Sequence, residues 1–128
     1  MKMEKKKVMV VDDEEDFLKI TKLNLEQTGR FEVAAVSDAT DIMSRVRSFR
    51  PDIILLDILM PKTGGVEACK MLKEDAEAKH IPVVVISALD TENDKRAMKE
   101  LGAVDFIVKP IEKAELISRI EKVLRGRG

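Results

Sequence analysis

The sequence predicts an α/β domain in which a parallel sheet is covered by helices on both faces. Two observations predict it: short apolar runs alternate with longer amphipathic stretches, and this alternation repeats five times within 128 residues. The apolar runs are rich in β-branched residues and almost free of polar ones, which is typical of strands buried on both sides. Five strand–helix repeats favour a doubly wound sheet, because a parallel strand needs a crossover helix to reach its neighbour.

The five apolar runs locate the predicted strands, of which the second is the weakest. They cover residues 8–11, 32–36, 53–56, 83–86 and 106–108. In the stretches between them, the helical spacing of apolar residues predicts five helices. Phe17, Ile20 and Leu23 mark the apolar face of the first helix. The other four faces are Ile42, Val46 and Phe49; Val66, Cys69 and Leu72; Ala97, Met98 and Leu101; and Leu116, Ile120, Val123 and Leu124.

The length of 128 residues suits one domain, with a core at about 6–124 and residues 125–128 as a tail or the start of a linker. The formal net charge of −1 gives no support for a general nucleic-acid or anionic-membrane surface. The basic run at 5–7 precedes too few apolar residues for a signal peptide, and no run is long enough for a membrane span. Cys69 is the only cysteine, which excludes an internal disulfide, so a reduced, cytoplasmic location is expected.

Charged or hydroxyl-bearing residues directly follow four of the five predicted strands. Asp12 and Asp13 follow the first, Asp57 the third, Ser87 the fourth and Lys109 the fifth. In an open parallel sheet the carboxyl ends of the strands share one edge, and ligands bind there near the switch in strand order. Three carboxylates, one hydroxyl and one ammonium should therefore meet in one patch.

Such a patch carries a charge of about −2, which is unfavourable without a cation. Magnesium suits it, because this ion binds a few carboxylates and keeps several waters. The carboxylate of Asp57, beside a metal and Lys109, could attack phosphorus and form an acyl phosphate. The Lys109 ammonium would offset charge on the transferring phosphoryl group, and the hydroxyl of Ser87 could donate a hydrogen bond to it.

Each of these residues also has a simpler interpretation. Asp12 or Asp13 could cap the first helix, with Glu14 and Glu15 complementing the helix dipole. Asp57 could begin a turn, Ser87 could cap a helix, and Lys109 could be a solvated lysine. Together the simpler roles are weaker, because they do not explain why all these positions end a strand.

Four segments make the chain resemble the response-regulator receiver domains of two-component signalling, which have a chemotaxis-Y-like fold. These are VVDDEEDF at 10–17, DIILLDILMPKTGG at 52–65, IPVVVISAL at 81–89 and LGAVDFIVKPIEKAELISRI at 101–120, and the resemblance covers about residues 6–124. It implies a flavodoxin-like sheet in the order 2-1-3-4-5 with five flanking helices. It also implies a cis Lys109–Pro110 bond.

The resemblance implies a role for each site residue. Asp57 would be the phosphoacceptor. The phosphoryl group would be contacted by the hydroxyl of Ser87 and the ammonium of Lys109. Phe106 would be the aromatic switch residue, without the hydroxyl that a tyrosine would bring. Magnesium would be held by Asp12, Asp13, Asp57 and the backbone carbonyl of Leu59. Thr63-Gly64 departs from the family's commoner Met-Asp pair, which puts the loop after the phosphoacceptor in doubt.

The same resemblance implies the partners. The phosphodonor would be a phosphohistidine on a sensor histidine kinase or a histidine phosphotransfer protein. The surface formed by the fourth helix, fifth strand and fifth helix would signal to an effector protein or a fused output domain. Direct nucleic-acid or membrane binding is not expected. Nor is enzymatic activity beyond self-catalysed phosphotransfer and slow autodephosphorylation.

Two alternatives belong to other functional classes. An aspartate-nucleophile magnesium phosphatase places an acid/base aspartate two residues after the nucleophile, where this chain has Leu59, which cannot transfer a proton. An inert receiver-like binding module would have lost an acidic, acceptor or lysine position, and none is lost here.

Two finer expectations concern dimerisation and the lifetime of the phosphorylated state. Part of a charged set that links receivers of transcription factors is present as Lys95, Asp105, Glu115 and Arg119, but Val104 and Gly126 lack the charges that would complete it. We therefore expect a monomer, with at most a weak dimer after phosphorylation. Leu59 and Leu89 stand where side chains shape the approach of the hydrolytic water, so the phosphoryl group should be lost slowly. Leu59→Asn with Leu89→Glu should speed its loss roughly tenfold.

Overall fold

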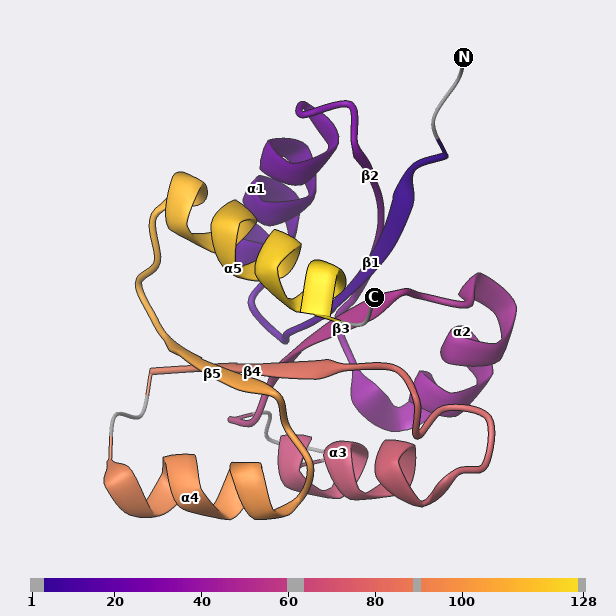
Figure 1. The fold of residues 1–128 in the computed structure, drawn as a ribbon, viewed down its shortest axis with the longest axis vertical. Helices are drawn as coiled ribbons and strands as arrows, with labels where there is room; N and C mark the ends of the chain where they lie inside the picture. The colour runs from indigo at the N-terminus through magenta and orange to yellow at the C-terminus, as the bar shows by residue number, and fades with distance from the viewer. Residues whose placement is uncertain (1–3, 60–63, 89–90, 127–128) are drawn as a thin grey trace.

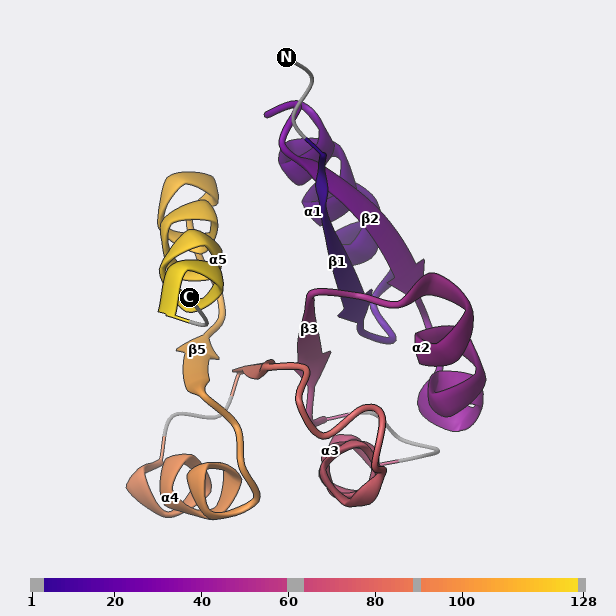
Figure 2. The ribbon, with the colours of Figure 1, turned by 45° about the vertical axis from the view of Figure 1, so that its right-hand side comes forward.

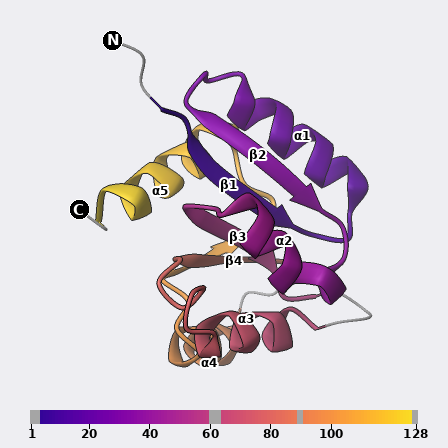
Figure 3. The same cartoon turned by 90° about the vertical axis from the view of Figure 1, so that its right-hand side faces the viewer.

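The computed structural model describes residues 4–59, 64–88 and 91–126. Five parallel strands form one sheet in the order β2-β1-β3-β4-β5, as the sequence analysis predicted (Figures 1 and 3). The strands are β1 (Lys6–Val11), β2 (Phe31–Val36), β3 (Ile53–Asp57), β4 (Val83–Ser87) and β5 (Asp105–Val108). The helices are α1 (Glu15–Glu26), α2 (Ile42–Phe49), α3 (Gly65–Glu74), α4 (Glu92–Glu100) and α5 (Lys113–Gly126), and a 3₁₀ turn, Ala39–Asp41, leads into α2.

The sheet separates two apolar cores, one on each face. Alternate strand residues supply both, because successive side chains of a strand point to opposite faces. On one face they pack against α1 and α5, through residues such as Leu25 and Ile120. On the other they pack against α2, α3 and α4, through residues such as Ile42, Leu72 and Met98. Figure 2 shows β5 between α5 above it and α4 below it.

Strand register brings the predicted site residues to one edge of the sheet. Val11 pairs with Leu56, and Asp57 pairs with Ile86. Because the strands are parallel, the residues at their carboxyl ends lie side by side at this edge. The predicted convergence of strand ends is thus confirmed by the register.

The predicted apolar face of α1 is right for Phe17, which packs against the core, and wrong for the other two residues. Ile20 and Leu23 are 59% and 58% exposed, while Leu18, Thr21 and Leu25 are buried. The predicted and the buried residues both have helical spacing. The buried set was not recognised as an apolar face because its central residue is a threonine. The structure therefore leaves two large apolar side chains on the outer side of α1.

The other helices follow their predicted faces with smaller departures. In α3, Cys69 and Leu72 are buried as predicted, but Val66 in the first turn is 43% exposed. In α4 only Met98 is buried, whereas each of the other four α-helices buries at least two residues. Within the described residues, no helix combines the length and the apolar character that crossing a bilayer requires.

Candidate functional site

The site begins with three aspartates at the ends of β1 and β3. Asp12, Asp13 and Asp57 each offer a carboxylate oxygen, and the three oxygens lie within 4.8 Å of one another. Asp12 and Asp57 are buried, at 1% and 4% exposure, whereas Asp13 faces solvent. The predicted convergence of these carboxylates is present in the structure.

Local hydrogen bonds orient the two buried aspartates. Oδ1 of Asp12 accepts the backbone N–H of Glu14 at 2.9 Å, and Oδ1 of Asp57 accepts the N–H of Leu59 at 3.0 Å. The simpler interpretation of Asp57 as a turn former is thus partly right, whereas Asp12 does not cap α1, whose N-cap residue is Glu14. Neither interpretation accounts for the second oxygens, because each Oδ2 faces the ammonium of Lys109.

Lys109 is the cation of the site and is not a solvated lysine. Its side chain is 13% exposed, and its Nζ donates to Asp12 at 2.6 Å and to Glu14 at 2.8 Å. Asp57 Oδ2 lies farther away, at 3.8 Å, and the ring of Phe17 has its centroid 4.4 Å from Nζ. Burial acts to lower the pKa of Lys109, but the hydrogen bonds to Asp12 and Glu14 outweigh it and raise that pKa. The group is therefore a permanent positive charge at neutral pH.

The predicted hydroxyl and aromatic residues, Ser87 and Phe106, lie on the adjacent strands β4 and β5. Ser87 is fully buried at the end of β4, and its carbonyl accepts the backbone N–H of Lys109 at 2.8 Å. It is not a helix cap, because Thr91 caps α4 by accepting the N–H of Asp94. Phe106 is half-buried on β5 and packs against the core beneath α2, α3 and α4. The Lys109–Pro110 bond is cis, as expected.

The environment of Asp57 raises its pKa above the ordinary value. Burial is the main cause, and the negative charges of Asp12 and Asp13 act in the same direction. The N–H of Leu59 and the charge of Lys109 oppose the shift without cancelling it. A further positive charge at this position would therefore favour the ionised carboxylate.

The three aspartates fit a magnesium ion. Ligand oxygens on opposite sides of such an ion are about 4.2 Å apart, since each bond is about 2.1 Å long. The oxygens of Asp12, Asp13 and Asp57 already lie within 4.8 Å of one another, so small side-chain rotations would bring them into range. Hard carboxylate oxygens are also the ligand type that magnesium prefers.

The segment after Asp57 needs a glycine at the start of α3. A Cβ atom on Gly65 would lie 2.3 Å from the carbonyl oxygen of Asp57 and 2.3 Å from the Cα of Ile58. Leu59, whose carbonyl is the predicted metal ligand, is 46% exposed at the rim of the site. Thr63 and Leu89, which the sequence analysis also named, lie outside the described residues.

Comparison with known proteins gives the family. The family model for the response regulator receiver domain matches residues 8–121. The chain belongs to this family. The alkaline phosphatase synthesis transcriptional regulatory protein PhoP of Bacillus subtilis is 37% identical over 120 residues, which cover 94% of this chain and 49% of PhoP. The probable transcriptional regulator ycf27 of Guillardia theta is 38% identical over 121 residues, which cover 94% of this chain and 46% of that protein.

The receiver fold is also present in solved structures. The chemotaxis protein CheY4 of Vibrio cholerae superposes with a TM-score of 0.88 at 25% identity, covering 94% of this chain and 99% of CheY4. The receiver chain spans about half the length of the two curated relatives. Its relatives are signalling proteins of two-component systems rather than enzymes in the usual sense.

Two residues of this receiver site were not predicted. Glu14 had been interpreted only as a partner of the helix dipole, and Phe17 as part of an apolar face; both contact Lys109. Glu14 and Lys109 are 95 positions apart in the sequence, and nothing in the local pattern distinguishes Glu14 from Glu15. Only the packing of α1 beside the end of β5 decides which glutamate reaches the lysine.

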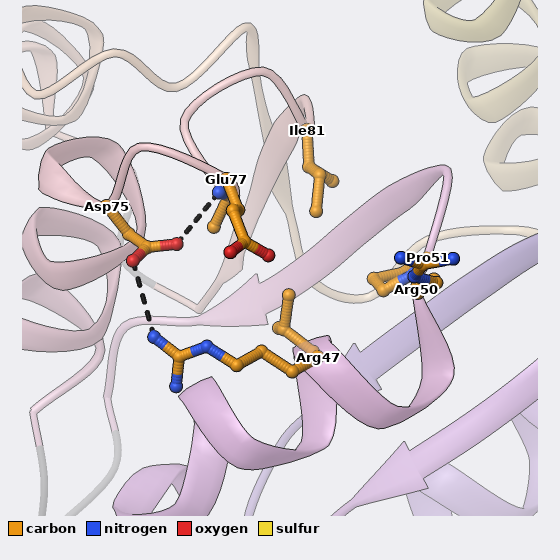
Figure 4. A pocket seen from close by; sticks show the side chains of 8 residues that line it. Arg47, Arg50, Pro51, Asp75, Glu77 and Ile81 are labelled. Carbon is orange, nitrogen blue, oxygen red and sulfur yellow. Dashed lines mark hydrogen bonds and ion pairs between the residues drawn. The ribbon is translucent and has the colours of Figure 1, made fainter.

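A pocket of about 380 Å³ in this receiver domain lies at the other edge of the sheet (Figure 4). The end of α2 and the segments before β3 and β4 line it, and Arg47 donates to Asp75 across it at 3.4 Å. Its residues precede strands, whereas the acidic residues follow them. The pocket is therefore separate from the acidic site.

Proposed function

We propose that this receiver domain is switched by phosphorylation of Asp57 in the presence of magnesium. The observation that carries the proposal is the placement of a buried carboxylate beside two further aspartates and Lys109 at one sheet edge. The donor would be a phosphohistidine on a sensor histidine kinase or a histidine phosphotransfer protein. The same arrangement argues against an inert binding module, because a site without chemistry has no need to bury two carboxylates.

In the proposed transfer, one carboxylate oxygen of Asp57 attacks phosphorus while the phosphorus–nitrogen bond of the phosphohistidine breaks. The ring nitrogen takes the electron pair of the broken bond, and with a proton on the ring, already present or taken from water, the histidine leaves as neutral imidazole. An acyl phosphate then remains on Asp57. Asp12, Asp13, Asp57 and the carbonyl of Leu59 would hold the magnesium ion, which supplies positive charge next to the phosphoryl oxygens. Lys109 would contribute a second positive charge, and the Ser87 hydroxyl would donate a hydrogen bond to the phosphoryl group.

The signal would reach the surface of α4, β5 and α5. A pocket of about 250 Å³ lies between α4 and β5, lined in part by Met98, Ala103 and Phe106. Phe106 is half-buried beside it, so a change at Ser87 could be coupled to the position of this ring. The few apolar contacts of α4 would let this helix follow at low cost. Phosphorylation at one edge of the sheet would thus alter a surface at its side.

We assign all 128 residues to one receiver domain acting in the cytoplasm, with residues 125–128 as a tail or linker. Because the chain spans about half of its curated relatives, the receiver would act on a fused output domain or on a separate effector. Slow loss of the phosphoryl group would follow from Leu59 and Leu89, since neither side chain can orient a water.

Acetyl phosphate with magnesium tests this function by intact mass. The wild-type chain should gain a single phosphoryl group that persists for a time, and Asp57→Asn should gain none. Asp16→Asn, which changes an exposed aspartate of α1, is the matched control and should be labelled like the wild type. Asp13→Ala should raise the magnesium concentration required. Rapid release of phosphate without accumulation of a labelled chain would indicate a phosphatase, and equal labelling of Asp57→Asn would show that the acceptor is another residue.

A further inference from the structure

Two residues at the start of α1 and in the segment before it contact the ammonium of Lys109. Glu14 Oε1 accepts from Nζ at 2.8 Å, and the face of Phe17 lies against the same ammonium, with its centroid 4.4 Å away. An ammonium has three N–H donors, and Asp12 and Glu14 engage two of them at hydrogen-bond distance. The distance from Lys109 Nζ to Asp57 Oδ2, 3.8 Å, is too long for a hydrogen bond.

We infer that Glu14, supported by Phe17, is a positioning residue that holds Lys109 towards α1 and must release it when Asp57 is phosphorylated. This inference rests on the proposed function. Asp12 is a candidate metal ligand, whereas Glu14 is outside the cluster of three carboxylates that could share an ion. Glu14 is therefore the carboxylate outside that cluster that competes with a phosphoryl group for the position of the Lys109 ammonium.

The exposure of Glu14 makes this contact exchangeable. The Glu14 side chain is 64% exposed, so water screens its attraction to Lys109, while Asp12 holds the same ammonium from a buried position. A phosphoryl group next to Asp57 carries about two negative charges and would attract the ammonium more strongly than a single exposed carboxylate. Glu14 thus restrains Lys109 before phosphorylation and loses it afterwards.

Because Glu14 holds Lys109 only before phosphorylation, its removal should change the rate of phosphorylation but not the rate at which the phosphoryl group is lost. Glu14→Gln keeps the length of the side chain and removes its charge, so Lys109 is freer to approach the incoming phosphoryl group. Phosphorylation by acetyl phosphate at saturating magnesium should become about two- to fivefold faster. Loss of the phosphoryl group should be unchanged, because Lys109 has left Glu14 both in the acyl phosphate and in its transition state. Phe17→Leu, which removes the ring face and keeps an apolar side chain, should act in the same direction.

Glu15→Gln is the matched control. It removes the same charge one position along the chain, and among the described residues Glu15 forms no hydrogen bond or ion pair with Lys109. Both rates of Glu15→Gln should stay close to those of the wild type. In the magnesium-free protein, the side-chain NMR resonances of Lys109 should shift in Glu14→Gln and stay in place in Glu15→Gln, which tests the contact independently of phosphorylation.

The outcomes separate this inference from the proposed function. Equal rates and equal spectra for Glu14→Gln and Glu15→Gln would overturn the inference, as would slower phosphorylation of Glu14→Gln, which would mean that Glu14 assists Lys109. In both cases phosphorylation of the wild type on Asp57 would still support the proposed function. A wild-type chain that accepts no phosphoryl group would overturn the function and the inference together.

Discussion

At the scale of single residues, Gly65 lies against the backbone of the site, at Asp57 and Ile58. We expect Gly65→Ala to destabilise the fold by about 1–3 kcal/mol, because the new methyl group would overlap the backbone of Asp57 and Ile58, which cannot move aside as a side chain could. Urea unfolding followed by far-UV circular dichroism measures this change.

Gly64→Ala provides the control for that substitution. Nothing lies within 4 Å of the position that its Cβ atom would take, and the φ of Gly64 is −57°, which alanine adopts freely. Its cost should stay below about 1 kcal/mol, mostly from its position before the first turn of α3. If the two variants were equally stable, the close contact at Gly65 would not be a constraint on the fold.

The site residues themselves were largely predictable from the sequence because each ends a strand. Burial of a strand is visible as an apolar run, so the first polar residue after the run, such as Asp57, marks the sheet edge. The finer arrangement was not predictable in this way. Whether Lys109 contacts Asp12, Glu14 or Asp57 depends on differences of about 1 Å between atoms from distant segments.

At the scale of elements, one ion pair joins α5 to β5. Arg119 donates to both oxygens of Asp105, at 2.8 and 2.7 Å, and to the carbonyl of Phe106 at 3.2 Å. Burial acts to raise the pKa of Asp105, but the hydrogen bonds from Arg119 and from the N–H of Phe106 outweigh it and lower that pKa. The pair therefore fixes the position of α5 next to the strand that carries the proposed aromatic switch.

Arg119→Met should lower the free energy of unfolding by about 1 kcal/mol at neutral pH, since the pair is two-pronged but partly open to water. The pKa of Asp105 is depressed in the folded chain, so the stabilisation is complete above the unfolded value of about 3.9 and is lost as pH falls through the folded value. The difference between variant and wild type should therefore persist at pH 6 and shrink below about pH 4.

Arg125→Met is the control for this measurement, because Arg125 lies in the same helix and forms no ion pair among the residues that the structure describes. Its effect should stay within about 0.5 kcal/mol. Urea is the suitable denaturant because guanidinium salts would screen the pair. A difference that stayed constant down to pH 2 would show that Arg119 stabilises the chain through packing instead of charge.

The elements also show where pattern reading fails. The strands were located correctly because β3 and β4 are buried along their whole length and β1 along most of it, which leaves continuous apolar runs in the sequence. The edge strands β2 and β5 are only partly buried, and β2 gave the weakest pattern. Helix α1 was located correctly but its buried face was not, because Thr21 occupies the centre of that face and two large apolar residues, Ile20 and Leu23, lie outside it. The spacing of apolar residues shows how many lie on each face of a helix. Which face is buried also depends on how the connections to the neighbouring strands orient the helix on the sheet.

At the scale of the whole molecule, the proposed phosphorylation site and the proposed output surface lie on different parts of the sheet. One edge gathers the acidic residues and Lys109, and the side formed by α4, β5 and α5 carries the proposed output surface. Strands β4 and β5 connect them, since Ser87 and Phe106 lie on adjacent strands and Ser87 pairs with Val108. A local change in charge at the edge can therefore reach the side without a rearrangement of the sheet.

This arrangement predicts the oligomeric state. The unphosphorylated chain should be a monomer of 14.4 kDa, because Arg119, Asp105 and Glu115 of the charged set already pair within one chain. A dimer across α4, β5 and α5 would have to replace these pairs with equivalent pairs between chains, and exposed ion pairs contribute only about 0–1 kcal/mol each. Val104, which is 54% exposed on this face, adds little apolar area.

Light scattering after size-exclusion chromatography measures the mass directly. Acetyl phosphate with magnesium should produce at most a weak, concentration-dependent increase in mass, since any gain would have to come from the proposed movement of α4 and Phe106 and not from new charge pairs. Asp57→Asn, treated in the same way, should remain a monomer, which separates an effect of phosphorylation from an effect of the salt. A stable species of twice the chain mass without a phosphodonor would mean that the internal pairs of Arg119 do not limit association.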